Sequence, residues 1–144
     1  MSNLFSEADI KRLVHAFYGS VRKDDLLAPI FAQKIPDDHW PHHMAHICDF
    51  WSGIFLQTKR FDGNPLQKHL AVNGLTPDHF NHWLWLFKQT ADEILTPEQA
   101  KAVYVMAQRI AQSLQMGIAF HCETSGQKDH AFTAFAVRRR DSVK

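Results

Sequence analysis

Four of the ten histidines in this 144-residue chain lie within one short stretch, at His39, His42, His43 and His46. His42 and His46 are four positions apart, so a helix would place both on one face, which suits two ligands of a single metal ion. The stretch contains no HExxH motif and no carboxylate at a ligand offset. A solvated polar face explains these two histidines more simply. A helical protein that binds zinc or copper through all four histidines remains an alternative.

Two histidines have spacing or neighbours that favour a buried site. His43 precedes Ile47 by four positions and Phe50 by seven, so it lies at the edge of an apolar helix face and should point inward. His69 lies in the short segment 65–70, which begins with a proline and is soon followed by a glycine, so it could present one ligand rigidly. Taken singly, His43 is explained more simply as a hydrogen-bonded core histidine, and His69 is explained equally well as a histidine of a surface loop.

Tyr18 and Trp83 could supply buried hydrogen-bond donors. Tyr18 follows Phe17, which belongs to an apolar stripe, and Trp83 belongs to a second stripe. Trp85 lies two positions further on and should be nearer the surface. A buried hydroxyl or indole N–H needs a hydrogen-bond partner. In isolation, both residues would be ordinary core side chains.

Together, His43, His69, Tyr18 and Trp83 indicate a site with one strong metal ligand and several hydrogen-bond donors. An enclosure of aromatic and aliphatic walls with few polar groups is what an iron porphyrin needs. The aromatic side chains expected to wall the site are Phe17, Phe31, Phe50, Trp51 and Phe80.

The elements that must position these side chains are helices, because apolar residues recur every three to four positions. Ser6 can cap the first helix, the segment 96–99 has a capping-box pattern, and no segment alternates as a strand would. The sequence predicts an all-α protein with four long helices and two short ones. The expected helices are 7–21, one or two turns within 26–31, 41–57, 65–70, one that begins at Thr76-Pro77, and 97 to about 120, with a loop over 36–41.

Length and composition limit the possible classes of protein. A chain of 144 residues with 45% hydrophobic content fits one domain, which we place at 1–121, followed by a polar, basic extension at 122–144 that is a frayed helix or disordered. A net charge of +1 argues against binding to nucleic acid through phosphate neutralisation. No apolar run could span a membrane, and Cys48 and Cys122 form no CxxC, so we expect a reducing, cytoplasmic setting.

Four stretches of the chain resemble truncated haemoglobins of group III. They are FYGSVRKDDLLAPIF (17–31), the FW of HICDFWSGIFL (46–56), GNPLQKHL (63–70) and HFNHWLWLF (79–87). The resemblance extends from about Phe17 to Ser113. The chain lacks the Gly-Gly pairs that are typical of the other truncated groups, which fits group III.

This resemblance implies a two-over-two helical sandwich, a shortened globin fold, with haem b bound noncovalently. The absence of a CxxCH motif agrees with noncovalent binding. The resemblance places the proximal iron ligand at His69 and the distal groups at Tyr18, His43 and Trp83. The cofactor-binding residues expected on this basis are His69, Phe31, Ile47, Phe50, Trp51, Leu66 and Phe80.

The resemblance also implies binding of O2, NO and CO. Donation from Tyr18 and Trp83 to a bound ligand would slow its release, which suits chemistry on O2, NO or peroxide better than delivery of O2. His43 would either gate access to the pocket, which we favour, or add a third donor. We therefore expect NO dioxygenation or peroxidase-type reduction, supported by an unidentified reductase. An O2 carrier, a ligand sensor and a plain helical interaction module are the alternatives.

Overall fold

The computed structural model describes residues 4–72 and 74–126. Its first helix, α1 (Glu7–Val21), begins as predicted at Ser6. The Ser6 hydroxyl accepts a hydrogen bond from the backbone N–H of Asp9 at 3.1 Å, and the Asp9 carboxylate accepts one from the backbone N–H of Ser6 at 3.0 Å. This reciprocal cap satisfies amides that a helix start otherwise leaves unpaired. The predicted apolar stripe of α1, including Leu13, Phe17 and Val21, is buried.

Two short helical turns lead into the next long helix. They are α2 (Ala28–Ala32) and the 3₁₀ turn η1 (Asp37–His39), and α3 (Trp40–Leu56) follows at once. The prediction of a loop over 36–41 was therefore wrong. Pro41 is tolerated in the first turn of α3 because an amide there has no partner within the helix. The buried Trp40 ring anchors the same turn.

The chain between α3 and the short helix α4 (Pro65–Leu70) is tied to both α1 and α3 by Arg60. The guanidinium of Arg60 pairs with the Glu7 carboxylate of α1, and its Nε lies 3.2 Å from Oδ1 of Asp49 in α3. It also donates to Oγ of Ser52 at 3.1 Å. The start of this connection is thus fixed before the chain reaches α4.

The last two helices, α5 (Pro77–Ile94) and α6 (Pro97–Thr124), begin where the sequence predicts. The Thr96 hydroxyl accepts from the backbone N–H of Gln99 at 3.2 Å, as the capping-box pattern indicates. α6 continues to Thr124, about four residues beyond its predicted end near Phe120. Most of the predicted extension, residues 127–144, lies outside the described residues.

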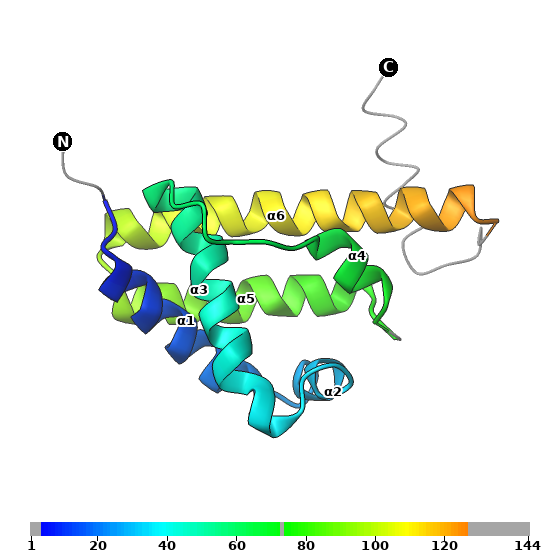
Figure 1. The fold of residues 1–144 in the computed structure, drawn as a ribbon, viewed down its shortest axis with the longest axis horizontal. Helices are drawn as coiled ribbons and strands as arrows, with labels where there is room; N and C mark the ends of the chain where they lie inside the picture. The colour runs from blue at the N-terminus through cyan, green and yellow to red at the C-terminus, as the bar shows by residue number, and fades with distance from the viewer. Residues whose placement is uncertain (1–3, 73, 127–144) are drawn as a thin grey trace, which may run out of the picture.

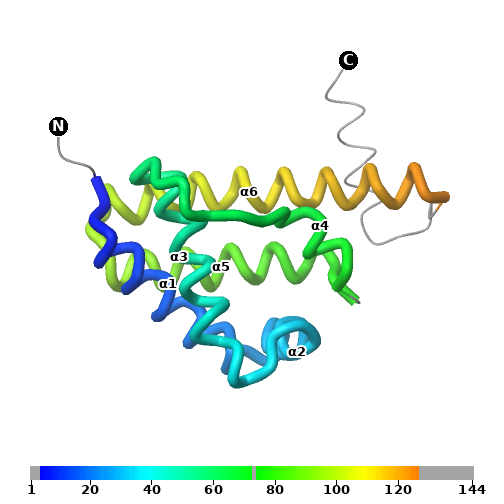
Figure 2. The backbone as a smooth tube through the Cα atoms, viewed as in Figure 1, coloured from blue at the N-terminus to red at the C-terminus, as the bar shows by residue number. Residues whose placement is uncertain are grey.

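Figures 1 and 2 show the arrangement of these helices. α5 and α6 lie side by side, and α1 packs against α3 on one side and against α5 on the other. The described residues form no strand, and the predictions of an all-α fold and a two-over-two sandwich are confirmed. No helix in the described ranges is long and apolar enough to span a lipid bilayer.

Gly117 of α6 allows α4 to approach α6 closely. A Cβ at Gly117 would lie 2.8 Å from Cδ1 and 2.9 Å from Cδ2 of Leu66, which is closer than real Cβ contacts come. Leu66 could not keep its place if residue 117 had a side chain. A glycine inside a helix costs up to about 1 kcal/mol relative to alanine, and here it makes room for the short helix that carries His69.

We predict that Gly117→Ala and Gly19→Ala have opposite effects on stability. Gly19 lies within α1, and a Cβ there would have no atom within 4 Å, so alanine should raise the free energy of unfolding by about 0.5–1 kcal/mol. At Gly117, displacement of Leu66 should cancel that gain and lower stability by about 1 kcal/mol. Urea unfolding of both variants measures the difference. A Gly117→Ala variant as stable as Gly19→Ala would contradict the close approach.

Candidate functional site

Tyr18 of α1 and Trp83 of α5 form a hydrogen-bonded pair. The Trp83 indole N–H donates to the phenol oxygen of Tyr18. Tyr18 is only 6% exposed, and this burial raises the pKa of its phenol well above the usual value. Phe17 packs edge-on against Trp83 with ring centroids 5.3 Å apart, and Phe31 packs edge-on against Tyr18 at 5.8 Å. The pair is therefore neutral at pH 7, and the phenol keeps its own proton for donation.

His43 of α3 points inward, as its helical spacing predicts. Its Nε2 is buried and has no hydrogen-bond partner in the described structure. The ring lies edge-on to Tyr18, with centroids 6.0 Å apart, and edge-on to Trp40 at 5.3 Å. Burial lowers the pKa of His43 to about 4, and the charges of His46 and His42 contribute further. A neutral imidazole nitrogen that lacks a partner beside a buried phenol indicates a place for a polar ligand.

His69 of α4 has its Nδ1 at 2.6 Å from the backbone carbonyl oxygen of Pro65. With its proton on Nδ1, the imidazole donates to this carbonyl and leaves the lone pair of Nε2 as the one that can coordinate a metal. Burial lowers the pKa of His69, and the bond to Pro65 partly opposes that shift. The ring stacks on Phe80 of α5 with centroids 6.1 Å apart, which fixes its plane from one side.

α5 connects His69 with the Tyr18–Trp83 pair. Phe80 contacts His69, and Trp83, three positions later, contacts Tyr18. Three residues of helix advance by about 4.5 Å, so one face of α5 carries both contacts within a single turn. Pairwise contacts and this face of α5 thus link His69, Trp83, Tyr18 and His43 in one series of neighbours.

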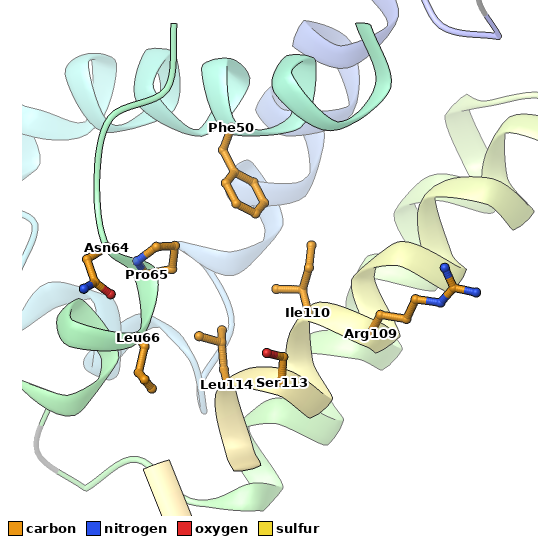
Figure 3. A pocket seen from close by; sticks show the side chains of 8 residues that line it. All are labelled: Phe50, Asn64, Pro65, Leu66, Arg109, Ile110, Ser113 and Leu114. Atoms are coloured by element: carbon orange, nitrogen blue, oxygen red, sulfur yellow. The ribbon is translucent and has the colours of Figure 1, made fainter. Parts of the chain in front are cut away.

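A cavity of about 350 Å³ opens between α3, α4 and α6 (Figure 3), and its lining includes none of Tyr18, His43, His69 and Trp83. Phe50 of α3 and Leu66 of α4, both predicted to bind a cofactor, line it. Sequence reasoning missed the wall that α6 contributes. The apolar period of α6 includes Ile110 and Leu114, but such a stripe is also what ordinary core packing requires. The α6 residues at the cavity are Arg109, Ile110, Ser113 and Leu114.

Three other residues predicted to bind the cofactor, Phe31, Ile47 and Trp51, differ in their surroundings. Phe31 and Ile47 are half-buried at the edge of the core, with Phe31 against Tyr18. Trp51 instead stacks between two core rings, at 5.6 Å from Phe87 and 6.0 Å from Phe55, so its contacts are those of a core residue.

The histidine cluster does not form a metal site. His42 is exposed, and His46 packs on Phe61 with ring centroids 4.6 Å apart. Across residues 4–72 and 74–126, no group of three or more His, Cys, Asp or Glu side chains is placed to hold a metal ion.

These residues fit an iron porphyrin. His69 offers one neutral nitrogen ligand, its tautomer set by the Pro65 carbonyl. The unpartnered Nε2 of His43 and the buried phenol of Tyr18 offer polar groups for a ligand of the iron. Apolar side chains such as Phe50 and Leu66 line a cavity next to α4, the short helix that carries His69. One axial nitrogen, few polar groups and apolar walls are the features that haem sites combine.

Comparison with known proteins places the chain among globins. Residues 3–116 match the model of the bacterial-like globin family. The chain is 35% identical over 112 residues to group 3 truncated hemoglobin ctb of Campylobacter jejuni, which covers 76% of this chain and 88% of that protein. The crystal structure of a group III truncated hemoglobin from Campylobacter jejuni matches with a TM-score of 0.73 at 34% identity, over 76% of this chain and 88% of that one.

A more distant structure shares the fold. It is the 2/2 hemoglobin of Synechococcus sp. PCC 7002, solved in the cyanomet state and with covalently attached heme. The match has a TM-score of 0.66 at 21% identity and covers 81% of this chain and 98% of that one.

We predict that His43 makes the protein sensitive to acid. The pKa of this histidine is about 4 in the folded chain and about 6.5 in the unfolded chain, so between these values the unfolded chain binds the extra proton. Stability should therefore be lost as the pH falls from 6.5 towards 4. Urea unfolding at pH 7 and pH 5 should show that His43→Leu removes roughly 1 kcal/mol of this loss, after allowance for solvent screening. His15→Leu is the control, because its ring is exposed on α1, and an equal effect of both variants would refute the prediction.

Proposed function

Because the chain belongs to the bacterial-like globin family, as a truncated haemoglobin of group III, we propose that it binds haem b noncovalently and converts reactive small ligands. The substrates are NO with O2, or peroxide, and storage of O2 is secondary. The observation that carries this proposal is the buried set of neutral polar groups formed by Tyr18, Trp83 and the unpartnered Nε2 of His43. The chain has no CxxCH motif for covalent attachment.

Bound haem supplies an iron with one open coordination position and redox chemistry toward O2, NO and peroxide. His69 would hold the iron through Nε2. Its bond to the Pro65 carbonyl makes the imidazole a stronger electron donor, and the stacking on Phe80 limits rotation of the ring. His69 is therefore a rigid, electron-rich ligand on the short helix α4.

On the distal side, Tyr18 is the principal donor to the ligand. Its oxygen already accepts from Trp83, so its own O–H is free to turn into the pocket. Negative charge that develops on a ligand atom would meet this O–H where little water competes, and such a bond contributes roughly 1–3 kcal/mol. Trp83 acts by orienting the phenol and, when its N–H is released, as a second donor.

His43 controls access to this pocket. Its ring lies edge-on to Tyr18 and Trp40, and its Nε2 has no partner to hold it in place. Rotation of the ring towards solvent would regain a hydrogen bond with water, so movement outward costs little. We therefore assign His43 to gating, with donation to the ligand as its alternative role.

Strong donation favours reaction over delivery, because it slows release of the ligand and stabilises charge that develops as O–O or O–N bonds rearrange. The dioxygenation combines one O2 and one NO into one nitrate, and the electron it consumes must come from a separate reductase. We place the reaction in the cytoplasm, where the free thiols Cys48 and Cys122 would stay reduced. An O2 carrier or a sensor is the competing function.

The experiment that tests the proposal follows two reactions of the haem-loaded protein. The O2-loaded ferrous protein is mixed with NO, and the ferric protein is given peroxide and a reducing dye. Near-stoichiometric nitrate supports dioxygenation, and dye turnover that cyanide blocks supports a peroxidase role. If both rates match those of a storage globin measured alongside, and O2 leaves readily, the enzymatic proposal is wrong and a carrier is favoured.

We predict that His69→Ala weakens haem binding by roughly tenfold or more. Loss of a group that only hydrogen-bonds to a metal-ligating histidine already costs about that much. Imidazole added to the variant should restore a histidine-type spectrum. Substitution of His42, His46 or His79 should leave the Soret band nearly unchanged. The measurement is haem content and the ferrous CO spectrum, and a His69→Ala variant with both unaltered would rule out this ligand.

We predict that Tyr18→Phe speeds O2 dissociation about tenfold, as expected for loss of one hydrogen bond of roughly 1.4 kcal/mol. Trp83→Phe should have a similar effect, and the double variant should exceed either by less than the product because Trp83 acts partly through Tyr18. Dissociation of CO, a less polar ligand when bound, should change less. Stopped-flow measurements with both gases decide, and equal changes for O2 and CO would mean that the two residues act by packing. His43→Leu should chiefly alter association.

A further inference from the structure

A side-chain hydrogen bond joins α5 to the turn between α1 and α2. Nε2 of His82 lies 2.6 Å from Oδ2 of Asp24. The side chains are 31% and 15% exposed, whereas the two side chains of the pair Lys88–Asp92 on the same helix are 50% and 53% exposed. The contact spans 58 positions of sequence, so it joins separate elements and does not stabilise α5 from within.

Asp24 organises the turn that it lies in. Its Oδ1 accepts from the backbone N–H groups of Leu26 at 3.0 Å and Leu27 at 2.9 Å, and its own carbonyl accepts from the N–H of Ala28 at 2.9 Å. Both carboxylate oxygens are thus used, one within the turn and one on His82. Asp24 lies six residues after Tyr18, in the turn that connects the end of α1 to α2 with Phe31. Asp24 therefore ties both elements to α5.

His82 immediately precedes Trp83 in α5. A contact that holds the His82 side chain therefore also limits rotation of the helix at Trp83. The ring of His82 is held from its second side by Trp85, which stacks on it at 5.7 Å and 19° and is 56% exposed. The apolar contacts of Phe17 with Trp83 and Phe87 hold α1 against α5 but are not directional. The bond from His82 to Asp24 adds the direction that those contacts lack.

We propose that Asp24 and His82 are positioning residues for the distal site, which set the rotation of α5 at Trp83 and thereby keep its indole N–H on the phenol oxygen of Tyr18. This inference rests on the proposed function only in assuming that the Tyr18–Trp83 pair meets the ligand. Loss of the hydrogen bond between His82 and Asp24 leaves α1 and α5 packed but lets the indole of Trp83 and the phenol of Tyr18 move relative to one another. The consequence is weaker donation to the ligand without unfolding.

The experiment uses three variants of the haem-loaded full chain. His82→Phe keeps a flat ring for Trp85 to stack on and removes the bond to Asp24. His82→Gln places an amide nitrogen near the position of Nε2 and should retain the bond. Asp24→Ser breaks the same bond from its other partner, while its hydroxyl can still accept from the turn amides. Lys88→Ala is the control, because it removes an exposed ion pair of the same helix.

Two readouts are taken on the CO- and O2-loaded protein. The first is the indole N–H resonance of Trp83 in a ¹H–¹⁵N spectrum, identified by its absence in Trp83→Phe. The second is the rate of O2 dissociation. In His82→Phe and Asp24→Ser the resonance should move, and O2 should leave about fivefold faster, less than the tenfold expected for loss of the whole bond. His82→Gln should return both readouts to within about twofold of the parent, and Lys88→Ala should change neither.

An unmoved Trp83 resonance in both His82→Phe and Asp24→Ser would overturn the inference, as would a His82→Gln variant that behaves like His82→Phe. If the resonance moves and returns as expected but Tyr18→Phe leaves O2 dissociation unchanged, the positioning stands and the distal role in the proposed function is wrong. The Trp83 resonance thus distinguishes failure of the positioning inference from failure of the proposed function. It reports on the indole itself and does not depend on turnover.

Discussion

The rotation of α5 about its own axis is the constraint on which the site depends. One face of this helix carries Phe80, which stacks on His69, and Trp83, which donates to Tyr18. One turn further on, Phe87 is buried against Phe17 and Trp51. A rotation of α5 by a fraction of a turn would separate both site contacts at once, because they share a rigid backbone. Packing of Phe87, which also stacks on Trp83 with ring centroids 5.2 Å apart, therefore helps to position the indole.

A second constraint follows from the shortness of α4. A helix of six residues cannot persist in water by itself, because helix nucleation is unfavourable and few bonds offset it. Asn64 caps it by accepting from the N–H of Gln67 at 3.1 Å, and His69 bonds back to the Pro65 carbonyl. Leu66 fits where Gly117 leaves space on α6. His69, the proposed metal ligand, is thus held by a cap, an internal bond and one tight contact, each supplied by a different part of the chain.

Local chemistry decides how much of this could be predicted from the sequence. Helix starts were predictable because caps such as Ser6 and Thr96 act within three residues, and apolar periodicity identified the buried face of α1. The inward direction of His43 followed from the same periodicity. Contacts between distant segments were not predictable. No local pattern indicates that Gly117 makes room for Leu66, or that the α6 stripe walls a cavity. Apolar periodicity placed Trp51 on the buried side of α3, but its stacking on Phe87 follows from tertiary packing.

The electrostatic character of the pocket links this architecture to the chemistry proposed for it. Burial raises the pKa of Tyr18 and lowers that of His43, so desolvation keeps both groups neutral at pH 7. Beside these two neutral groups, an uncharged diatomic ligand would bind at little desolvation cost. Charge that arises only after binding finds the phenol O–H already oriented by Trp83, with no reorganisation required. Selectivity for ligands that become polar inside the pocket thus follows from neutral, pre-oriented donors, and any element that fixes the indole against the phenol contributes to it.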